Sequence, residues 1–244
     1  ASSYPNISGI APLKEQASRF VKAFLDIDVK PEGCIPTVGS MMGTFASFIV
    51  CTHLSSEKDT ILFINPGFSV AFDVYDCRGE RLRDKLESIL AKGHIAGIVY
   101  SNPNNPSWVC LTEEELRYVG ELATKYDAIV IEDLAYLGMD FRKELGHPFE
   151  PPYQATVARY TKNYMLMLSA SKIFSYAGER IATVAISDEL YNRVYPKLKE
   201  EFGIDTLGRF FVFVVVYTLS SGVTHSVQYA LAAMYKAACD GTLD

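Results

Sequence analysis

The chain of 244 residues has few of the features that mark secreted, zinc-binding or membrane proteins. Its five cysteines are scattered and odd in number, with no CxxC pair and no Cys/His cluster. A disulfide framework or a structural zinc site is therefore not indicated, and we expect a reduced, cytoplasmic protein. The four histidines show no metal-ligand spacing, so no metal site is expected.

Long hydrophobic runs are also scarce. The longest covers residues 210–219, FFVFVVVYTL, and is too short to cross a bilayer, which takes roughly 20 apolar residues. It predicts a buried helix or strand. The first residues show no basic stretch followed by an apolar one, so we expect neither a signal peptide nor a membrane partner.

Positive charge is in deficit, because 23 Lys and Arg face 29 Asp and Glu for a net charge of -6. Nucleic-acid binding depends on basic surface, so no nucleic-acid partner is predicted. The chain is 49% hydrophobic and 21% charged, which is typical of a globular protein with a sizeable core.

What the chain does have is an alternation of strand-like and helical patterns. Strands are expected at 60–64, 95–100, 128–131, 164–168 and 181–186, with a short one from Ile35 to a turn at Gly39 and Ser40. Helices are expected at 13–24, 41–54, 82–90, 112–126, 187–201 and 223–238. This order predicts a three-layer α/β/α fold with a mostly parallel sheet. The Pro- and charge-rich segment 137–160 is expected to be irregular surface.

One connection is unusually short. The strand at 60–64 is followed at 72–75 by a second strand-like run, whereas parallel neighbours need a crossover of a dozen or more residues. The two runs form a hairpin, or residues are missing near 69–72. The regular alternation elsewhere favours missing residues.

Polar clusters follow the strands at 39–40, 66–68, 102–107, 133–136 and 169–172. Ligand sites in such sheets lie beyond the carboxyl ends of the strands, so we expect one common site. The most informative cluster is segment 169–180, SASKIFSYAGER. Lys and Arg at the end of a buried strand are rare unless paired, and burial makes a lysine amine a better nucleophile.

A lysine at such a position can hold an aldehyde as a Schiff base, and Arg180 with Ser169 and Ser171 offers donors for a phosphate. An aldehyde and a phosphate together describe pyridoxal 5'-phosphate (PLP). The alternative is a solvated loop whose Lys172 and Arg180 face water. The upstream clusters favour the cofactor.

Three motifs carry a resemblance to a known family: N-P-N-N-P at 102–106, D-x-x-Y at 133–136, and S-x-S-K followed by G-x-R at 169–180. In this order they resemble the large domain of a fold-type I PLP enzyme of the class I/II aminotransferase family. The resemblance implies that Lys172 forms the Schiff base and moves the substrate proton. It also implies that Asp133 pairs with the pyridine nitrogen and keeps it protonated, so that the ring accepts electrons.

The resemblance assigns the remaining contacts as well. Tyr136 and Asn105 would hydrogen-bond the phenolic oxygen, and Phe68 would stack on the ring. The phosphate would be held by Ser169, Ser171, Arg180, Ser40 and the backbone amides of Gly39 to Met41. Tyr4, in Y-x-x-I-x-G, would reach the phosphate in the partner subunit, which implies a homodimer with shared active sites. Blander roles remain open: a turn for Asn105, core packing for Phe68 and a strand-end cap for Asp133.

The sequence departs from the family in two ways. The usual N-P-T-G reads Asn105-Pro106-Ser107-Trp108, so a tryptophan replaces a glycine beside the pocket. The resemblance also implies a carboxylate-binding arginine in a C-terminal small domain, whereas this chain stops at Asp244. We therefore expect residues 1–244 to form the PLP-binding large domain, without the N-terminal arm and the small domain.

The predicted function is transfer of an amino group between an amino acid, aspartate or an aromatic one, and a 2-oxo acid. A lyase or decarboxylase on the same fold is the alternative, because the pocket selects the bond that breaks. A non-catalytic aminotransferase-like binding domain is less favoured, since the chain shows neither a helix-turn-helix pattern nor a basic patch.

Overall fold

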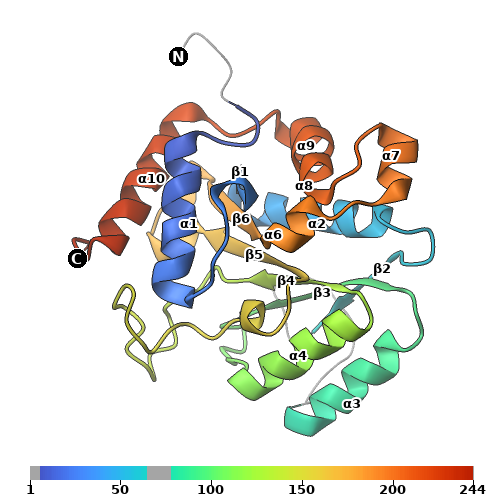
Figure 1. The fold of residues 1–244 in the computed structure, drawn as a ribbon. Coiled ribbons are helices and arrows are strands. Elements are labelled where there is room, and N and C mark those ends of the chain that lie inside the picture. Colours follow the sequence, from blue (N-terminus) through green and yellow to red (C-terminus); the bar gives the residue numbers. More distant parts are fainter. Residues whose placement is uncertain (1–5, 65–77, 244) are drawn as a thin grey trace.

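The structure, a computed structural model, describes residues 6–64 and 78–243 (Figure 1). Its centre is a six-stranded sheet with the spatial order β1-β6-β5-β4-β3-β2. The strands are β1 (Cys34–Thr37), β2 (Thr60–Phe63), β3 (Ile95–Ser101), β4 (Ile129–Asp133), β5 (Tyr164–Ser169) and β6 (Ala182–Ile186). Strand β6 runs antiparallel to β1 and β5, and the pairs from β2 to β5 are parallel. The prediction of a mostly parallel sheet is confirmed.

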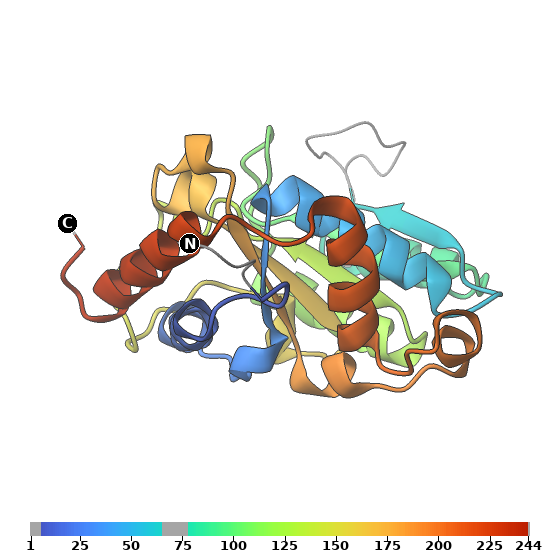
Figure 2. The ribbon, with the colours of Figure 1, turned by 90° about the horizontal axis from the view of Figure 1, so that it is seen from above.

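Helices cover both faces of this sheet (Figures 1 and 2). They are α1 (Ala11–Leu25), α2 (Gly39–His53), α3 (Gly79–Leu90), α4 (Glu113–Lys125), α5 (Ala170–Ile173), α6 (Asp188–Asn192), α7 (Pro196–Phe202), α8 (Leu207–Phe210), α9 (Tyr217–Ser220) and α10 (His225–Cys239). One core joins the sheet to α1, α3, α4 and α10, and the other joins it to α2, α6, α7 and α8. These two cores make the predicted three layers.

Strand β5 shows why the central strands read as continuous apolar runs. Leu166 and Leu168 contribute to the core under α1 and α4, whereas Met165 and Met167 contribute to the core under α2. Successive side chains of a strand point to opposite faces, so a strand covered on both sides must be apolar at every position.

The helix predicted for 187–201 is in fact two helices. Ser187 caps the first as expected, because its Oγ accepts a hydrogen bond from the backbone N–H of Leu190 at 3.1 Å. This helix, α6, ends at Asn192, and α7 begins at Pro196. Proline cannot donate a helical hydrogen bond and disfavours helical backbone before it, so the helix could not run through.

The apolar run at 210–219 is helical, one of the two predicted possibilities. It continues α8 through a π-helical stretch, η4 (Phe211–Val216), into α9. Its inner side, including Phe211 and Val215, is buried against the sheet, and Phe213 and Tyr217 are exposed.

Segment 137–160 contains only a short 3-10 turn, η2 (Val157–Arg159), so it is irregular as predicted. It is not merely surface, however, since Leu145 and residues 154–158 are buried. The strand-like run at 72–75 and the proposed gap near 69–72 lie outside the described residues.

Candidate active site

Several chain segments meet at one edge of the sheet, by which we mean the side formed by the carboxyl ends of β1, β3, β4 and β5 and by the start of β6. Ser101 on β3 pairs with Asp133 on β4, and Asp133 pairs with Met167 on β5. Further along, Ser169 pairs with Ala182 on β6, and Ala182 pairs with Thr37 on β1. The start of the antiparallel β6 therefore lies where its neighbours end. This edge brings together Gly39 to Met41, Asn105, Asp133, Tyr136, Ser169, Ser171, Lys172 and Arg180.

Lys172 lies in α5, a one-turn helix that begins directly after β5. The buried Ser169 caps this turn, because its Oγ accepts a hydrogen bond from the Ser171 N–H at 3.3 Å. The Lys172 side chain is exposed, and among the described residues no partner binds its amine. The expectation of a buried lysine is wrong, since the chain has already left the buried sheet at α5. The result is a free amine at the edge of the sheet.

Asp133 ends β4 and lies on the face covered by α2, by alternation from Ile131. Its Oδ1 accepts one hydrogen bond, from the Ala135 N–H at 3.0 Å. Within the described part of the chain it has no ion pair with Lys or Arg. Burial raises the pKa of the Asp133 carboxyl to about 6. A carboxyl group that loses hydration without gaining a cation is well placed to accept a proton-bearing ligand nitrogen.

Asn105 and Tyr136 are neighbours, although 31 positions separate them in the sequence. The Asn105 Nδ2 donates a hydrogen bond to the Tyr136 Oη at 3.0 Å. The loop that carries Asn105 is held by its own backbone, since the Trp108 N–H donates to the Asn104 carbonyl at 2.8 Å. Two residues predicted to bind the same ligand oxygen are therefore in contact.

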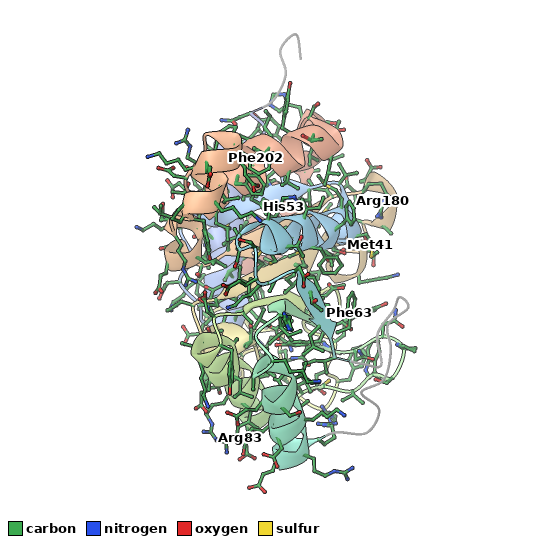
Figure 3. The ribbon with its side chains drawn as sticks, turned by 90° about the vertical axis from the view of Figure 1, so that its right-hand side faces the viewer. Met41, His53, Phe63, Arg83, Arg180 and Phe202 are labelled. Carbon is green, nitrogen blue, oxygen red and sulfur yellow. The ribbon has the colours of Figure 1, made fainter. Side chains whose placement is uncertain are left out.

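The amino end of α2 forms the other side of the edge. The helix begins at Gly39, slightly earlier than predicted, and no side chain of the described segments caps its first amides. Gly39 has φ +73°, a backbone conformation that favours glycine, and a Cβ there would lie 2.6 Å from Arg180 Nη2 and displace the guanidinium. Figure 3 labels Met41 at the start of this helix and Arg180 on the segment after β5. The Met41 side chain is exposed, so a role in ligand binding would use its backbone N–H.

Arg180 is exposed, and its Nη1 donates to the Ala177 carbonyl at 2.8 Å and lies 3.5 Å from Ser171 Oγ. A guanidinium, a hydroxyl and the positive end of a helix together suit a phosphate. Tyr4 and Phe68, the other two predicted contacts, lie outside the described residues.

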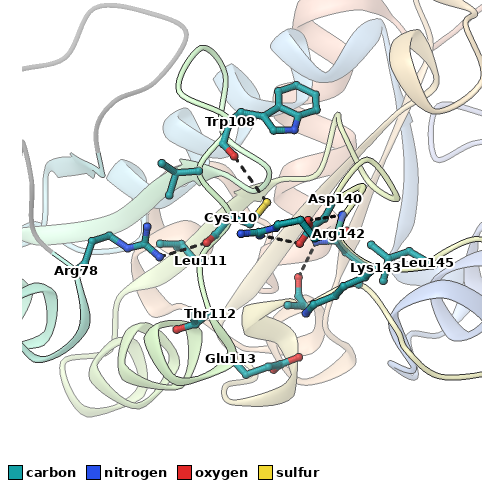
Figure 4. Close-up of a pocket in the computed structure, with 13 residues that line it drawn as sticks. Arg78, Trp108, Cys110, Leu111, Thr112, Glu113, Asp140, Arg142, Lys143 and Leu145 are labelled. Atoms are coloured by element: carbon teal, nitrogen blue, oxygen red, sulfur yellow. Dashed lines mark hydrogen bonds and ion pairs between the residues drawn. The ribbon is translucent and has the colours of Figure 1, made fainter.

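A cavity of about 500 Å³ lies on the far side of the loop 102–109 (Figure 4). Its two arginines are already paired: Arg78 Nε lies 2.6 Å from Glu115 Oε1, and Arg142 Nε lies 2.7 Å from Asp140 Oδ1. Trp108 is one of the residues that line this cavity, and its ring extends away from Arg78 and Arg142 in Figure 4. Both cavity arginines are thus paired with carboxylates, and Lys143 is a third cationic side chain that lines the cavity.

The Trp108 ring instead contacts Tyr136, with ring centroids 5.3 Å apart, and stacks on Phe141 at 6.4 Å. The sequence drew attention to Trp108 because this residue replaces the glycine of the family's N-P-T-G motif. It did not signal Phe141, which lies in an irregular segment with no period to place it.

In the residues that the structure describes, no three His, Cys, Asp or Glu side chains gather closely enough to hold a metal ion. Within the same ranges no helix is long and apolar enough to cross a membrane.

The model of the family "Aminotransferase class I and II" matches residues 1–212. The chain belongs to this family. The match confirms the family predicted from the motifs at 102–106, 133–136 and 169–180.

Two curated relatives show how far the similarity extends. A "Probable aspartate aminotransferase" of Methanocaldococcus jannaschii is 26% identical over 199 residues, which cover 76% of this chain and 49% of that protein. A "Histidinol-phosphate aminotransferase" of Chlorobaculum tepidum is 27% identical over 227 residues, which cover 84% of this chain and 58% of that protein. The chain spans about half the length of the curated relatives it matches.

Solved aminotransferases support the fold. A crystal structure of an aminotransferase from Mycobacterium tuberculosis has a TM-score of 0.71 at 19% identity, covering 98% of this chain and 58% of that one. Cystalysin from Treponema denticola, whose crystal structure contains a pyridoxal 5'-phosphate cofactor, has a TM-score of 0.67 at 16% identity, covering 99% and 59%. The three-layer fold is therefore that of aminotransferases.

Proposed function

We propose that the protein is a PLP-dependent aminotransferase that moves an amino group between an amino acid and a 2-oxo acid. Residues 1–244 would serve as its PLP-binding large domain. The observation that carries the proposal is that Lys172 and Asp133 lie at the same edge of the sheet, and that neither has an ion-pair partner among residues 6–64 and 78–243. Membership of the class I and II family supports it.

The residues at this edge fit PLP in chemistry and in order. When bound, PLP supplies an aldehyde that an amine can hold and a ring that withdraws electrons from the substrate Cα. Asp133 has spare acceptor capacity for a ring N–H, and Asn105 and Tyr136 offer donors for the phenolic oxygen. The phosphate would be bound by Ser40, Ser169, Ser171, Arg180 and the amides of Gly39 to Met41.

The protein's own groups would then act as follows. The Lys172 amine holds the cofactor and, once displaced, carries a proton to and from the substrate Cα. The Asp133 carboxylate keeps a proton on the ring nitrogen, because a buried negative charge stabilises the protonated partner. Both roles need groups with no competing partner in the fold, and both side chains meet that condition in the described residues.

The direct test is to add PLP to the purified protein and to follow absorbance near the edge of the visible range. We expect a new band that borohydride abolishes. The full-length protein, loaded in the same way, is then incubated with single amino acids, and we expect the matching 2-oxo acid. Release of an amine or of pyruvate in its place would indicate a decarboxylase or a lyase, and absence of the band would contradict the cofactor assignment.

We also propose that the protein is a homodimer. Exposed apolar side chains lie on two neighbouring helical segments beside the site. They are Met41 and Phe45 on α2, Phe213 on η4 and Tyr217 on α9, and η4 packs against both α2 and α9. Phe45 is 54% exposed and Tyr217 is 53% exposed. Large apolar side chains clustered on one face usually mark a contact surface. A second copy is the favoured occupant, because this surface continues the edge at which the implied partner residue Tyr4 would act.

Mass measurement in solution tests the dimer. We expect twice the chain mass for the wild type and a monomer for Phe45→Glu combined with Tyr217→Lys. Phe149→Glu serves as the control, since Phe149 is an exposed aromatic residue next to α1, where its N–H binds the Ala23 carbonyl. A monomeric wild type, or a dimer unaffected by the double substitution, would contradict this interface.

The proposed location is the cytoplasm. Cys34, Cys51, Cys110 and Cys239 are all free thiols, as expected in a reducing compartment. Fractionation of the producing cells tests this, and recovery outside the cytoplasm would contradict it.

A further inference from the structure

Trp108 occupies a backbone position that disfavours it. Its φ is +58°, in the left-handed region where a large side chain is strained and glycine is not. The ring does not compensate by entering the core, since Trp108 is 43% exposed. Burial in the core therefore gives no reason for a tryptophan here, and strained residues are found at functional sites.

The surroundings of Trp108 are aromatic. Its ring meets the edge of Tyr136 at 5.3 Å and stacks nearly parallel on Phe141 at 6.4 Å. Phe141 is 81% exposed, so the fold leaves most of its ring uncovered. Trp108 and Phe141, called here the aromatic wall, form an apolar surface that the described residues leave largely open.

The aromatic wall is fixed beside the candidate active site. Tyr136 contacts both the Trp108 ring and the Asn105 amide, so it links the wall to a proposed cofactor contact. The loop is held rigid because the Ser107 hydroxyl donates to Asn104 Oδ1 at 2.7 Å and the Asn104 N–H donates to the Val109 carbonyl at 2.9 Å.

The charged side chains near loop 102–109 also favour an apolar ligand group at the aromatic wall. Arg78 and Arg142 lie on the cavity side, opposite the Trp108 ring, and each is held by a carboxylate (Figure 4). Neither guanidinium is therefore free to pair with a substrate carboxylate, although Lys143 also lines the cavity, and a substrate side chain at the wall would meet the faces of the aromatic rings. Aromatic faces favour aromatic and large apolar groups over carboxylates.

We propose that the aromatic wall contacts the side chain of the amino-acid substrate and selects an aromatic or large apolar one. This inference rests on the proposed aminotransferase function and names its substrate class.

Trp108 is the only tryptophan in the chain, so its fluorescence reports on the wall without turnover. We expect 3-phenylpropionate, which has an aromatic ring and a carboxylate but no amine to transfer, to change the emission of the PLP-loaded protein in a saturable manner. Succinate at the same concentrations should leave it unchanged. An equal response to both acids, or a response to succinate alone, would overturn the proposal, as would no response to either.

Substitutions give a second readout. Glycine at position 108 relieves the backbone strain, so Trp108→Gly is expected to fold. In this variant and in Phe141→Ala, kcat/KM for phenylalanine relative to alanine should fall about tenfold, the size of an aromatic contact. Trp108→Phe should retain most of the preference. Phe149→Ala, an exposed aromatic residue on the same irregular segment, is the control and should change nothing. An unchanged ratio in both wall variants, or a wild-type preference for aspartate, would contradict the proposal.

The two levels of inference fail separately. If PLP does not load onto the protein, the proposed function is wrong. If PLP loads and alanine is converted, the proposed function holds. If the wall variants then leave the substrate preference unchanged and 3-phenylpropionate does not change Trp108 emission more than succinate does, only the substrate class is wrong.

Discussion

Glu132 and Asp133 are adjacent carboxyl residues of β4 that serve different faces of the sheet. Glu132 is fully buried on the face of α1 and α4. Its carboxyl group accepts three hydrogen bonds there, from Thr156 Oγ1 at 2.5 Å, from the Val157 N–H at 3.2 Å and from Tyr100 Oη at 3.2 Å. Asp133, on the face of α2, receives a single hydrogen bond from the part of the chain that the structure describes, the one from the Ala135 N–H. The first carboxyl is satisfied by the fold, and the second keeps spare acceptor capacity as far as the described residues show, which fits the proposed ligand contact.

This contrast separates structure from function in a way that burial alone does not. Burial raises the pKa of Glu132 to about 7 and that of Asp133 to about 6. Glu132 joins the irregular segment 137–160 to the sheet through Thr156 and Val157, and so it positions that segment. Among the described residues Asp133 bonds only within its own turn, which agrees with the binding role proposed for it.

The largest effect is expected for Lys172→Ala. The proposed site has no second amine at this position, so amino transfer should fall by about 10³-fold or more. Circular dichroism should be unchanged because the Lys172 side chain is exposed. Lys92→Ala, at an exposed lysine after α3, is the control for loss of one positive charge. Activity near the wild-type level in Lys172→Ala would remove this residue from the mechanism.

Asp133→Asn comes next and tests the open side of the comparison. Turnover with saturating PLP should fall by about 100-fold, because a neutral amide no longer holds a proton on the ring nitrogen. In the protein without PLP, the free energy of unfolding at pH 8 should rise by about 1 to 2 kcal/mol, since an ionised, half-buried carboxylate is removed. Steady-state kinetics and urea titrations measure the two effects. Reduced stability with normal turnover would make Asp133 a structural residue.

Glu132→Gln tests the satisfied side. The folded-state pKa of Glu132 lies above that of the unfolded chain, so its contribution to stability is full below about pH 4 and is lost as pH rises through about 7. Between pH 4 and pH 8 the wild type should lose up to about 3 kcal/mol more than the Gln variant, which has no charge to bury. Urea titrations at both pH values measure the difference. Equal pH dependence in the two proteins would contradict the assignment.

The smallest effect on stability is expected for Trp108→Gly. The substitution relieves left-handed backbone strain, which stabilises the fold. It also raises the conformational entropy of the unfolded chain and removes the contact with Tyr136, which both destabilise the fold. The free energy of unfolding should therefore change by no more than about 1 kcal/mol. Thermal unfolding checks this. A loss of several kcal/mol would show that Trp108 is needed for folding, and its strain would then no longer point to the substrate.

Strand positions and the common edge were predictable because they depend on local pattern. Apolar runs such as 164–168 identify buried strands, and polar clusters after them mark the carboxyl ends. The reversed direction of β6 was not predictable, since its apolar pattern is the same for either direction. The break before Pro196 had a clear signal in the proline itself.

The exposure of Lys172 and the position of Phe141 depend on features that no period encodes. Lys172 follows a fully buried strand, and one turn of helix is enough to bring it to the surface. Phe141 reaches Trp108 from an irregular segment whose path is set by buried contacts such as Thr156 with Glu132. Tertiary contacts of this type appear only in the folded chain.

The most direct test of the account is to reduce the PLP-loaded protein with borohydride, digest it and identify the modified peptide by mass spectrometry. We predict a single pyridoxyl group, on Nζ of Lys172, and a sharply lower yield of this peptide in Arg180→Ala. Modification of another lysine, or equal labelling of many exposed lysines, would show that the edge formed by β4, β5 and β6 is not the cofactor site.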